Sequence, residues 1–145
     1  MASELIFQRK VIEACRELGG RGIKMSNRFM AGVPDLLLLY EGRTYLVEVK
    51  LVVMPVKQDD LVKVTQSPLT PLQTKFLLEW KEAGACAGLM LCCQTPTEDL
   101  ILCTRNIQRH LMPTREQYEL HSHRRARGQR LRVLMAQGLL HPLIS

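Results

Sequence analysis

Residues 34–50 read PDLLLLYEGRTYLVEVK, two apolar runs separated by Glu41-Gly42. The first run has the length of a strand and is almost all leucine, which favours a central strand buried on both faces. The second run has the composition of its hairpin partner. Because side chains alternate between the two faces of a strand, Glu48 and Lys50 are expected to share one face. This stretch therefore predicts an antiparallel pair with polar groups placed in an apolar setting.

The register of this hairpin determines which polar groups meet. A two-residue loop would pair Tyr40 with Arg43 and place Asp35 directly opposite Glu48, with Cβ atoms ~5 Å apart. Two like charges on a largely buried hairpin are destabilising unless a cation neutralises them. Hard cations such as Mg²⁺ bind one or two carboxylates, waters and phosphate oxygens. A three-residue loop without a bulge would break the alignment, and Glu-Gly is a weaker turn signal than Asn-Gly.

The sequence before the hairpin predicts a helix of about four turns, which Ser3 N-caps and Gly19-Gly20 ends. Its apolar residues follow the i, i+4, i+7 spacing of one helix face: Phe7, Val11, Ala14, Cys15 and Leu18. A short extended piece, 22–25, then leads into a polar, glycine-containing loop that ends at Gly32. The hairpin strands follow this loop.

After the hairpin, residues 52–69 form a long connection that we expect to be a surface loop or flap. Thr70 at the N-cap, Pro71 at the first helical position and Gln73 two residues later predict a helix that begins with a capping box. Gly84 is expected to end it. The predicted buried stripe of this helix consists of Leu72, Phe76, Leu77, Trp80 and Ala83.

The remaining elements complete an α/β order with a mixed sheet. Residues 85–93 predict a small-residue buried strand, and 100–103 predict one more short strand. A helical, arginine-rich end follows. The order is helix, strand, strand, strand, helix, strand. We accordingly divide the chain into a domain, 1–104, and a basic helical C-terminal extension, 105–145.

Length and composition suit one soluble domain. The 145 residues and 46% hydrophobic content are enough for one buried core. No apolar run approaches the ~18 residues of a membrane span, and the first ten residues lack a secretory signal, so we expect a cytoplasmic protein with no membrane partner. Five cysteines without a Cys-x-x-Cys pair argue against a disulfide framework and against a zinc finger. Scarce aromatic residues argue against a single-strand binder with many stacking platforms.

The net charge of +6 comes from the last 42 residues. Residues 1–103 carry 12 Lys/Arg and 12 Asp/Glu, whereas 104–145 carry 8 Arg and 2 Glu. Arginine matches phosphate oxygens, so this distribution indicates a polyanion partner, although a solvated helix face is the alternative. In a helix, Arg124, Arg127 and Arg130 would follow one another at steps of three and form a basic ridge. Leu131, Leu134 and Met135 would form an apolar face that docks on the core or on a second subunit. The candidate DNA contacts are Arg124, Arg125, Arg127, Arg130 and Arg132.

Two motifs resemble a known nuclease superfamily. Pro34-Asp35, twelve residues and then Glu48-Val49-Lys50 resemble the PD-(D/E)XK signature. The stretches GVPDLL, residues 32–37, and SPLTPLQ, residues 67–73, resemble its VRR-NUC branch, which includes small phage and bacterial proteins similar to Holliday junction resolvases. The resemblance covers roughly residues 3–93 and implies a restriction-endonuclease-like αβββαβ core. That order agrees with the one predicted from the residues.

The resemblance also implies a site. Asp35 and Glu48 would bind Mg²⁺ or Mn²⁺ with help from the Val49 carbonyl, and Lys50 would assist the attacking water. A glutamate of the first helix often joins such metal sites, and Glu4 is the candidate here, with Glu13 in reserve. Gln73 matches a helix glutamine near the site, although its capping role alone would account for it.

The function implied is metal-dependent hydrolysis of DNA phosphodiester bonds, structure-selective as in Holliday junction resolvases, by a homodimer in a bacterial or phage-infected cell. One alternative is a non-catalytic DNA-binding subunit that keeps the fold. Another is a nicking or restriction-type nuclease on ordinary duplex. The long loop 52–68 and the basic end depart from the family pattern and bear on substrate preference.

Overall fold

The structure is a computed structural model that describes residues 4–25, 32–65, 69–108 and 112–144. Its elements in chain order are α1 (Glu4–Glu17), β1 (Arg21–Lys24), β2 (Leu36–Tyr40), β3 (Arg43–Val53), β4 (Lys63–Val64), α2 (Pro71–Glu82), β5 (Cys86–Gln94), β6 (Glu98–Thr104), α3 (Arg115–His121), β7 (His123–Ala126), α4 (Leu131–Ala136) and η2 (His141–Leu143). This confirms the α/β class and, apart from the two-residue β4, the predicted order as far as β6. The expected N-cap Ser3 and the motif residues Ser67 and Pro68 lie outside the described residues.

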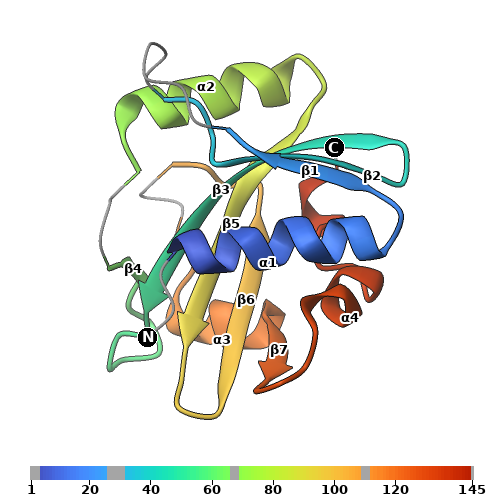
Figure 1. Ribbon diagram of the computed structural model, residues 1–145. Helices are drawn as coiled ribbons and strands as arrows, with labels where there is room; N and C mark the ends of the chain where they lie inside the picture. The colour runs from blue at the N-terminus through green and yellow to red at the C-terminus, as the bar shows by residue number, and fades with distance from the viewer. Residues whose placement is uncertain (1–3, 26–31, 66–68, 109–111, 145) are drawn as a thin grey trace.

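Within the described residues, seven strands form one mixed sheet in the order β1-β2-β3-β5-β6-β7, with β4 paired to the end of β3 (Figure 1). The β3–β5 pair is parallel and the other pairs are antiparallel. The parallel connection between β3 and β5 runs through α2, as a parallel pair requires. The sheet therefore has β3 and β5 at its centre, where apolar burial is greatest.

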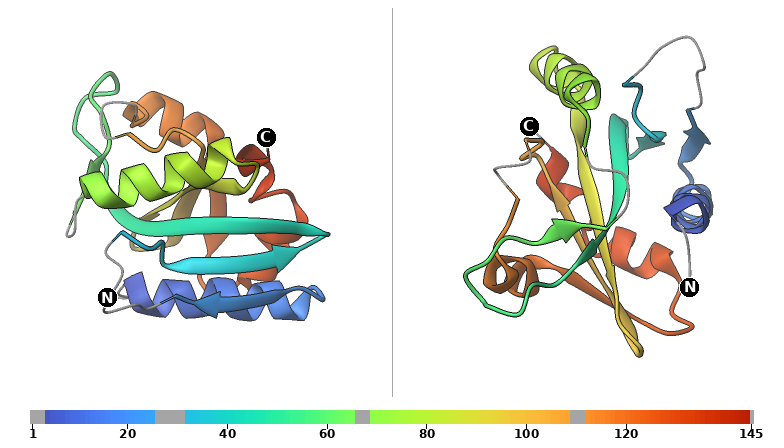
Figure 2. Two further views of the ribbon diagram at one scale, coloured as in Figure 1. Left: turned by 90° about the horizontal axis from the view of Figure 1, so that it is seen from above. Right: turned by 90° about the vertical axis from the view of Figure 1, so that its left-hand side faces the viewer.

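Helices cover both faces of the sheet. The views in Figure 2 place α1 and α2 on opposite sides of it. One core packs α1 and α4 against residues such as Val47 and Val49. The other packs Leu77 of α2 and Tyr118 of α3 against Leu46 and other residues of the opposite face. The alternation along β3 thus sends neighbouring residues into different cores, as its period of two predicts.

The β2–β3 register is the one predicted from the two-residue loop. Tyr40 pairs with Arg43, and the ladder continues to Leu36 opposite Val47. Glu41 and Gly42 both have positive φ, 51° and 75°. Positive φ at both central positions is characteristic of a type I′ turn, whose twist matches that of the flanking strands. The loop length and the pairing are therefore confirmed.

Helix α2 begins as predicted but buries less than predicted. Thr70 and Gln73 form the full capping box, and Pro71 is the first helical residue. Of the expected stripe, Leu77 is buried, whereas Leu72 and Trp80 are about half exposed, and Ala83 is exposed too. The helix turns Gln73 and Leu77, one turn apart, toward the sheet. The larger apolar residues consequently lie on its flank, where Phe76 stacks on Trp80 with ring centroids 5.4 Å apart.

The connection after the hairpin is shorter than predicted because β3 continues to Val53. Val52 and Val53 pair with β4, which lies inside the stretch expected to be a loop. The rest of the connection is attached to the start of α3. The Arg115 guanidinium donates to the Pro55 carbonyl at 2.9 Å, and Val62 N–H donates to the Pro113 carbonyl at 2.9 Å.

The C-terminal segment is helical in α3, α4 and η2, as predicted, but the strand β7 stands where the arginine spacing predicted a helix. Arg124 and Arg125 lie on β7, which pairs with β6, so the ridge at steps of three does not form. Arg127 follows the strand, Arg130 is the N-cap of α4, and Arg132 lies within α4. The physical reason lies in Asp99 of β6, which is 4% exposed and accepts from the Arg125 guanidinium at 2.7 Å. A buried carboxylate needs such a cation, and strand pairing supplies it.

The apolar residues of this segment belong to the main cores. The predicted docking of Leu131, Leu134 and Met135 is confirmed, because all three are buried in the core that contains α1. On the other face Tyr118 is fully buried, and its hydroxyl lies within hydrogen-bonding distance of the main-chain carbonyl oxygens of Leu91 on β5 and Leu100 on β6, which share its single proton. The segment thus contributes to both layers.

Tyr118→Phe should lower the free energy of unfolding by about 1–3 kcal/mol, because it removes the one buried donor that the Leu91 and Leu100 carbonyl oxygens share. Urea unfolding measures the change. Leu120→Ala, at a position 73% exposed on the same helix, is the matched control and should stay within about 0.5 kcal/mol of wild type. Equal stability of the two variants would contradict the role given to the Tyr118 hydroxyl.

Candidate active site

Asp35 and Glu48 meet where the β2–β3 hairpin ends. Continuing the register past the Leu36–Val47 pair places them opposite each other. Asp35 N–H donates to Glu48 Oε1 at 3.1 Å, and Val49 N–H donates to Asp35 Oδ2 at 2.9 Å. Each carboxylate is therefore held by the main chain of the other strand. The predicted juxtaposition of the two acids is present in the structure.

The start of α2 brings Gln73 to the same point. Its Nε2 donates to Glu48 Oε2 at 2.6 Å, while its Oε1 accepts from Thr70 N–H in the capping box. Gln73 therefore caps the helix and contacts the site, so the two roles considered from the sequence coexist. Gly32 permits this approach: its φ is +85°, and a Cβ there would lie 2.6 Å from the Leu72 carbonyl oxygen.

Burial dominates the electrostatics of the site. Glu48 is fully buried and Lys50 is 3% exposed, whereas Asp35 is half-buried. Burial first, and then the hydrogen bond and charge of Asp35, raise the pKa of Glu48 to about 9, while the Lys50 charge acts in the opposite direction. Without a metal, burial and the neighbouring Asp35 therefore favour the protonated form of Glu48.

These properties fit a divalent cation. Two carboxylates supply hard oxygen donors, and a cation would replace the proton that burial otherwise keeps on Glu48. Across the described residues no group of three or more His, Cys, Asp or Glu side chains forms a metal-binding cluster. The protein would thus offer two carboxylates and leave the other positions to the main chain, water or substrate.

Among the residues that the structure describes, no third carboxylate joins the pair. Glu4 Oε1 accepts from Leu51 N–H at 3.5 Å, so the start of α1 lies beside β3, but Glu4 does not join Asp35 and Glu48 in a cluster. The reserve candidate Glu13 lines a different cleft, with Lys10 and Arg130. Val49 contributes its N–H to the pair, as described above.

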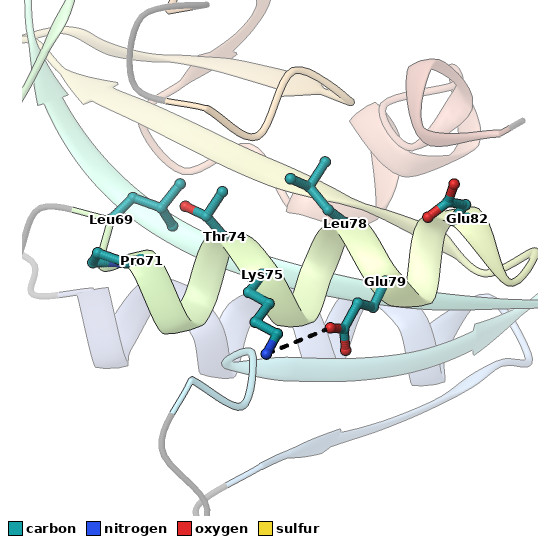
Figure 3. A pocket seen from close by; sticks show the side chains of 7 residues that line it. All are labelled: Leu69, Pro71, Thr74, Lys75, Leu78, Glu79 and Glu82. Atoms are coloured by element: carbon teal, nitrogen blue, oxygen red, sulfur yellow. Dashed lines mark ion pairs between the residues drawn. The ribbon is translucent and has the colours of Figure 1, made fainter.

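A pocket of about 470 Å³ runs along α2 without reaching these residues. Figure 3 shows its lining, which consists of Leu69, Pro71, Thr74, Lys75, Leu78, Glu79 and Glu82. Its ion pair, Lys75 to Glu79 at 3.9 Å, is largely exposed and adds little stability. This pocket is thus distinct from the carboxylate pair.

Each of the five C-terminal arginines has a protein partner. Arg124 pairs with Glu98 at 2.6 Å, and Arg130 and Arg132 both pair with Glu17, at 3.2 and 3.5 Å. The Arg127 guanidinium donates to the Thr95 carbonyl. Arg125, with 13% of its side chain exposed, pairs with Asp99. Sequence reasoning missed these partners because they lie on other elements, and no local spacing signals them.

Comparisons with known proteins add one structural likeness. No protein-family model matches the chain, and no curated protein does. Among solved structures, the chain is similar to Hjc of Archaeoglobus fulgidus, described as a Holliday junction resolvase from an archaeal hyperthermophile. The TM-score is 0.49 at 13% sequence identity, over 79% of this chain and 90% of that chain. At this level of similarity, roles for Asp35, Glu48 and Lys50 depend on the geometry described above.

No helix in the described part of the chain is long and apolar enough to cross a membrane.

Glu48→Gln should remove a pH dependence of stability from the metal-free protein. Between the model-compound pKa of 4.5 and the folded value of about 9, the unfolded state binds fewer protons than the folded state. Wild type therefore loses stability as the pH rises through this window, and the variant does not. Urea unfolding at pH 5 and pH 8 should show the variant gaining on wild type at the higher pH. Any hydrogen bond that glutamine gains or loses is common to both pH values, so an unchanged gap would contradict a protonated Glu48.

Proposed function

We propose that the protein is a metal-dependent endonuclease that hydrolyses DNA phosphodiester bonds, with Mg²⁺ or Mn²⁺ as the cofactor. The observation that carries this proposal is the pair of reciprocal hydrogen bonds between Asp35 and the Glu48-Val49 strand, with Lys50 on the same face and Gln73 on Glu48. A structural salt bridge would place a cation against Glu48. Here the buried carboxylate instead faces a second carboxylate and carries a raised pKa.

The residues of the chain divide the work. Asp35 and Glu48 would hold the metal, with the Val49 carbonyl as a further oxygen donor. A bound divalent cation supplies a Lewis acid that polarises the phosphate and lowers the pKa of a water. Gln73 fixes the orientation of Glu48 through its 2.6 Å hydrogen bond. Lys50 orients the attacking water or offsets the charge that develops on the phosphate in the transition state.

We further propose a VRR-NUC-type, structure-selective enzyme that acts on branched DNA as a homodimer. Support comes from the order of its motifs, from Gly32 to Gln73, which resembles that branch. A symmetric cut in two strands needs two sites, which a two-fold dimer provides. The exposed arginines, Arg124, Arg127, Arg130 and Arg132, are proposed as contacts to DNA phosphates. Arg125 is mainly structural, since it neutralises Asp99 inside the protein.

One set of assays separates this proposal from its alternatives. Labelled linear duplex, flap and four-way junction are incubated with wild type and with Asp35→Asn, in Mg²⁺, Mn²⁺ or EDTA. We expect metal-dependent cleavage by wild type, with the junction cut fastest. In the variant we expect a loss of at least about a hundredfold, because metal stabilisation is worth several kcal/mol.

The variant should still bind DNA at least as tightly, since a charge that repels phosphate is gone. Binding without cleavage by wild type in every metal would favour the non-catalytic subunit. Equal cleavage of all three substrates would favour a nuclease of ordinary duplex. Cleavage by Asp35→Asn at the wild-type rate would contradict the site assignment.

Lys50→Met should lower the cleavage rate by about 10²–10⁴-fold while metal affinity is kept, because the ammonium acts on the water or the transition state. Methionine keeps most of the buried stem and so limits the loss of packing. Calorimetric titration with Mn²⁺ measures affinity in wild type, Lys50→Met and Asp35→Asn. If Lys50→Met loses Mn²⁺ as Asp35→Asn is expected to, Lys50 serves the structure of the metal site and has no role in the chemistry.

A further inference from the structure

A cationic cleft of about 220 Å³ lies between α1 and the segment that joins β7 to α4. Its charged lining consists of Lys10, Glu13, Glu17, Arg125, Arg130 and Arg132. Because α1 and α4 share one core, the cleft is on the α1 face of the sheet. Glu48 and Gln73 meet under α2, and Figure 2 shows α2 on the opposite side of the sheet from α1. The cleft is therefore separate from the candidate active site.

The cleft carries a net positive charge, and the Lys10 ammonium group in it has no partner among the described residues. Four cations and two carboxylates line it, a formal excess of two positive charges, of which Asp99 offsets one through Arg125. The Lys10 ammonium group makes no hydrogen bond or ion pair with any residue that the structure describes. Its ammonium group is therefore available to an anion.

The three arginines of the cleft differ in how firmly they are held. One carboxylate, Glu17, binds Arg130 at 3.2 Å and Arg132 at 3.5 Å, which leaves most donors of each guanidinium unused. Arg125 is fixed by Asp99 and by the Gln129 carbonyl, which accepts from its Nε at 2.9 Å. Arg125 therefore loses little entropy when an anion binds, whereas Arg130 and Arg132, which are 69% and 49% exposed, contribute charge next to it. Glu17 is thereby neutralised, and Glu13 is the carboxylate that would oppose an anion.

We propose that this cleft binds a phosphate group of the DNA backbone, on the face of the protein opposite the bond that is cut. The inference rests on the proposed function for the identity of the ligand. Guanidinium forks and an ammonium group match phosphate oxygens. DNA that contacts both faces must pass around the protein or reach it as two arms, so the cleft favours branched DNA. It also gives Lys10 of α1 a place in a surface that the sequence assigned to the C-terminal arginines alone.

The test uses three charge variants of α1 and metal-free binding. Fluorescence anisotropy measures the affinity for a labelled four-way junction in EDTA, so that no cleavage occurs, across a series of salt concentrations. Lys10→Gln should weaken binding and should make the slope of log affinity against log salt shallower by about one unit. Glu13→Gln should tighten binding, because it removes the opposing carboxylate. Arg9→Gln, an exposed neighbour on the same helix outside the cleft, should have a smaller effect than Lys10→Gln.

Equal effects of Lys10→Gln and Arg9→Gln, with none from Glu13→Gln, would overturn the proposal, since only general charge would then matter. Titration with inorganic phosphate distinguishes the other source of the same chemistry. Suppose that Lys10→Gln weakens the binding of inorganic phosphate but leaves the affinity for DNA unchanged. The cleft would then be a site for free phosphate, and the DNA assignment would be overturned. Normal metal-dependent cleavage with that result would leave the nuclease intact. If wild type does not cleave DNA but the variants change its DNA affinity as expected, the proposed nuclease activity would be contradicted and the proposed phosphate site in the cleft would be supported.

Discussion

The buried carboxylate of Glu48 is the point at which the β2–β3 hairpin and α2 meet. It accepts from Asp35 N–H at the start of β2 and from Gln73 on α2 while lying on β3 itself. A charged group in this position is unfavourable unless it is neutralised and its oxygens are satisfied. The orientation of α2 follows from this requirement. To place Gln73 over Glu48, the helix turns Leu77 inward and leaves Leu72 and Trp80 half exposed, so a polar contact takes precedence over the burial of two large apolar side chains.

The same carboxylate depends on a turn far from it in the fold. Glu41 and Gly42 accept positive φ, and this sets the pairing of every residue along the two strands. A slip by one residue would send each side chain of β3 to the other face and would move Glu48 among the apolar residues under α1. Turn geometry at one end of the hairpin therefore controls the chemistry available at the other end. The reciprocal contacts of Asp35 and Val49 lock the register where the ladder ends.

Local signals made the hairpin, the α2 capping box and the inward face of α1 predictable, because each depends on residues a few positions apart. Two features could not be predicted, because each depends on a contact with a residue that is distant in the sequence. The arginine spacing of three fits a helix, but Arg125 takes a strand conformation in which it meets Asp99, 26 residues earlier. The apolar stripe of α2 has good helical periodicity, yet its rotation is decided by Glu48 on another element. The prediction for Glu4 failed for a related reason. Its position on the first helix could be predicted, but its distance from Asp35 and Glu48 depends on how that helix packs on the sheet.

Closure of the core beneath α1 joins the two ends of the described chain. Arg130 and Glu17 are 113 residues apart in sequence, and α4 packs with Phe7 and Val11 of α1 in one core. Contacts of such sequence separation carry a loop-closure cost in entropy. The apolar side of α1 packs partly on β2 and β3, which follow it closely in the sequence, and partly on α4, which does not. The segment richest in arginine is thus also the one that completes the fold, and chains interrupted before it would expose an adhesive surface to quality control.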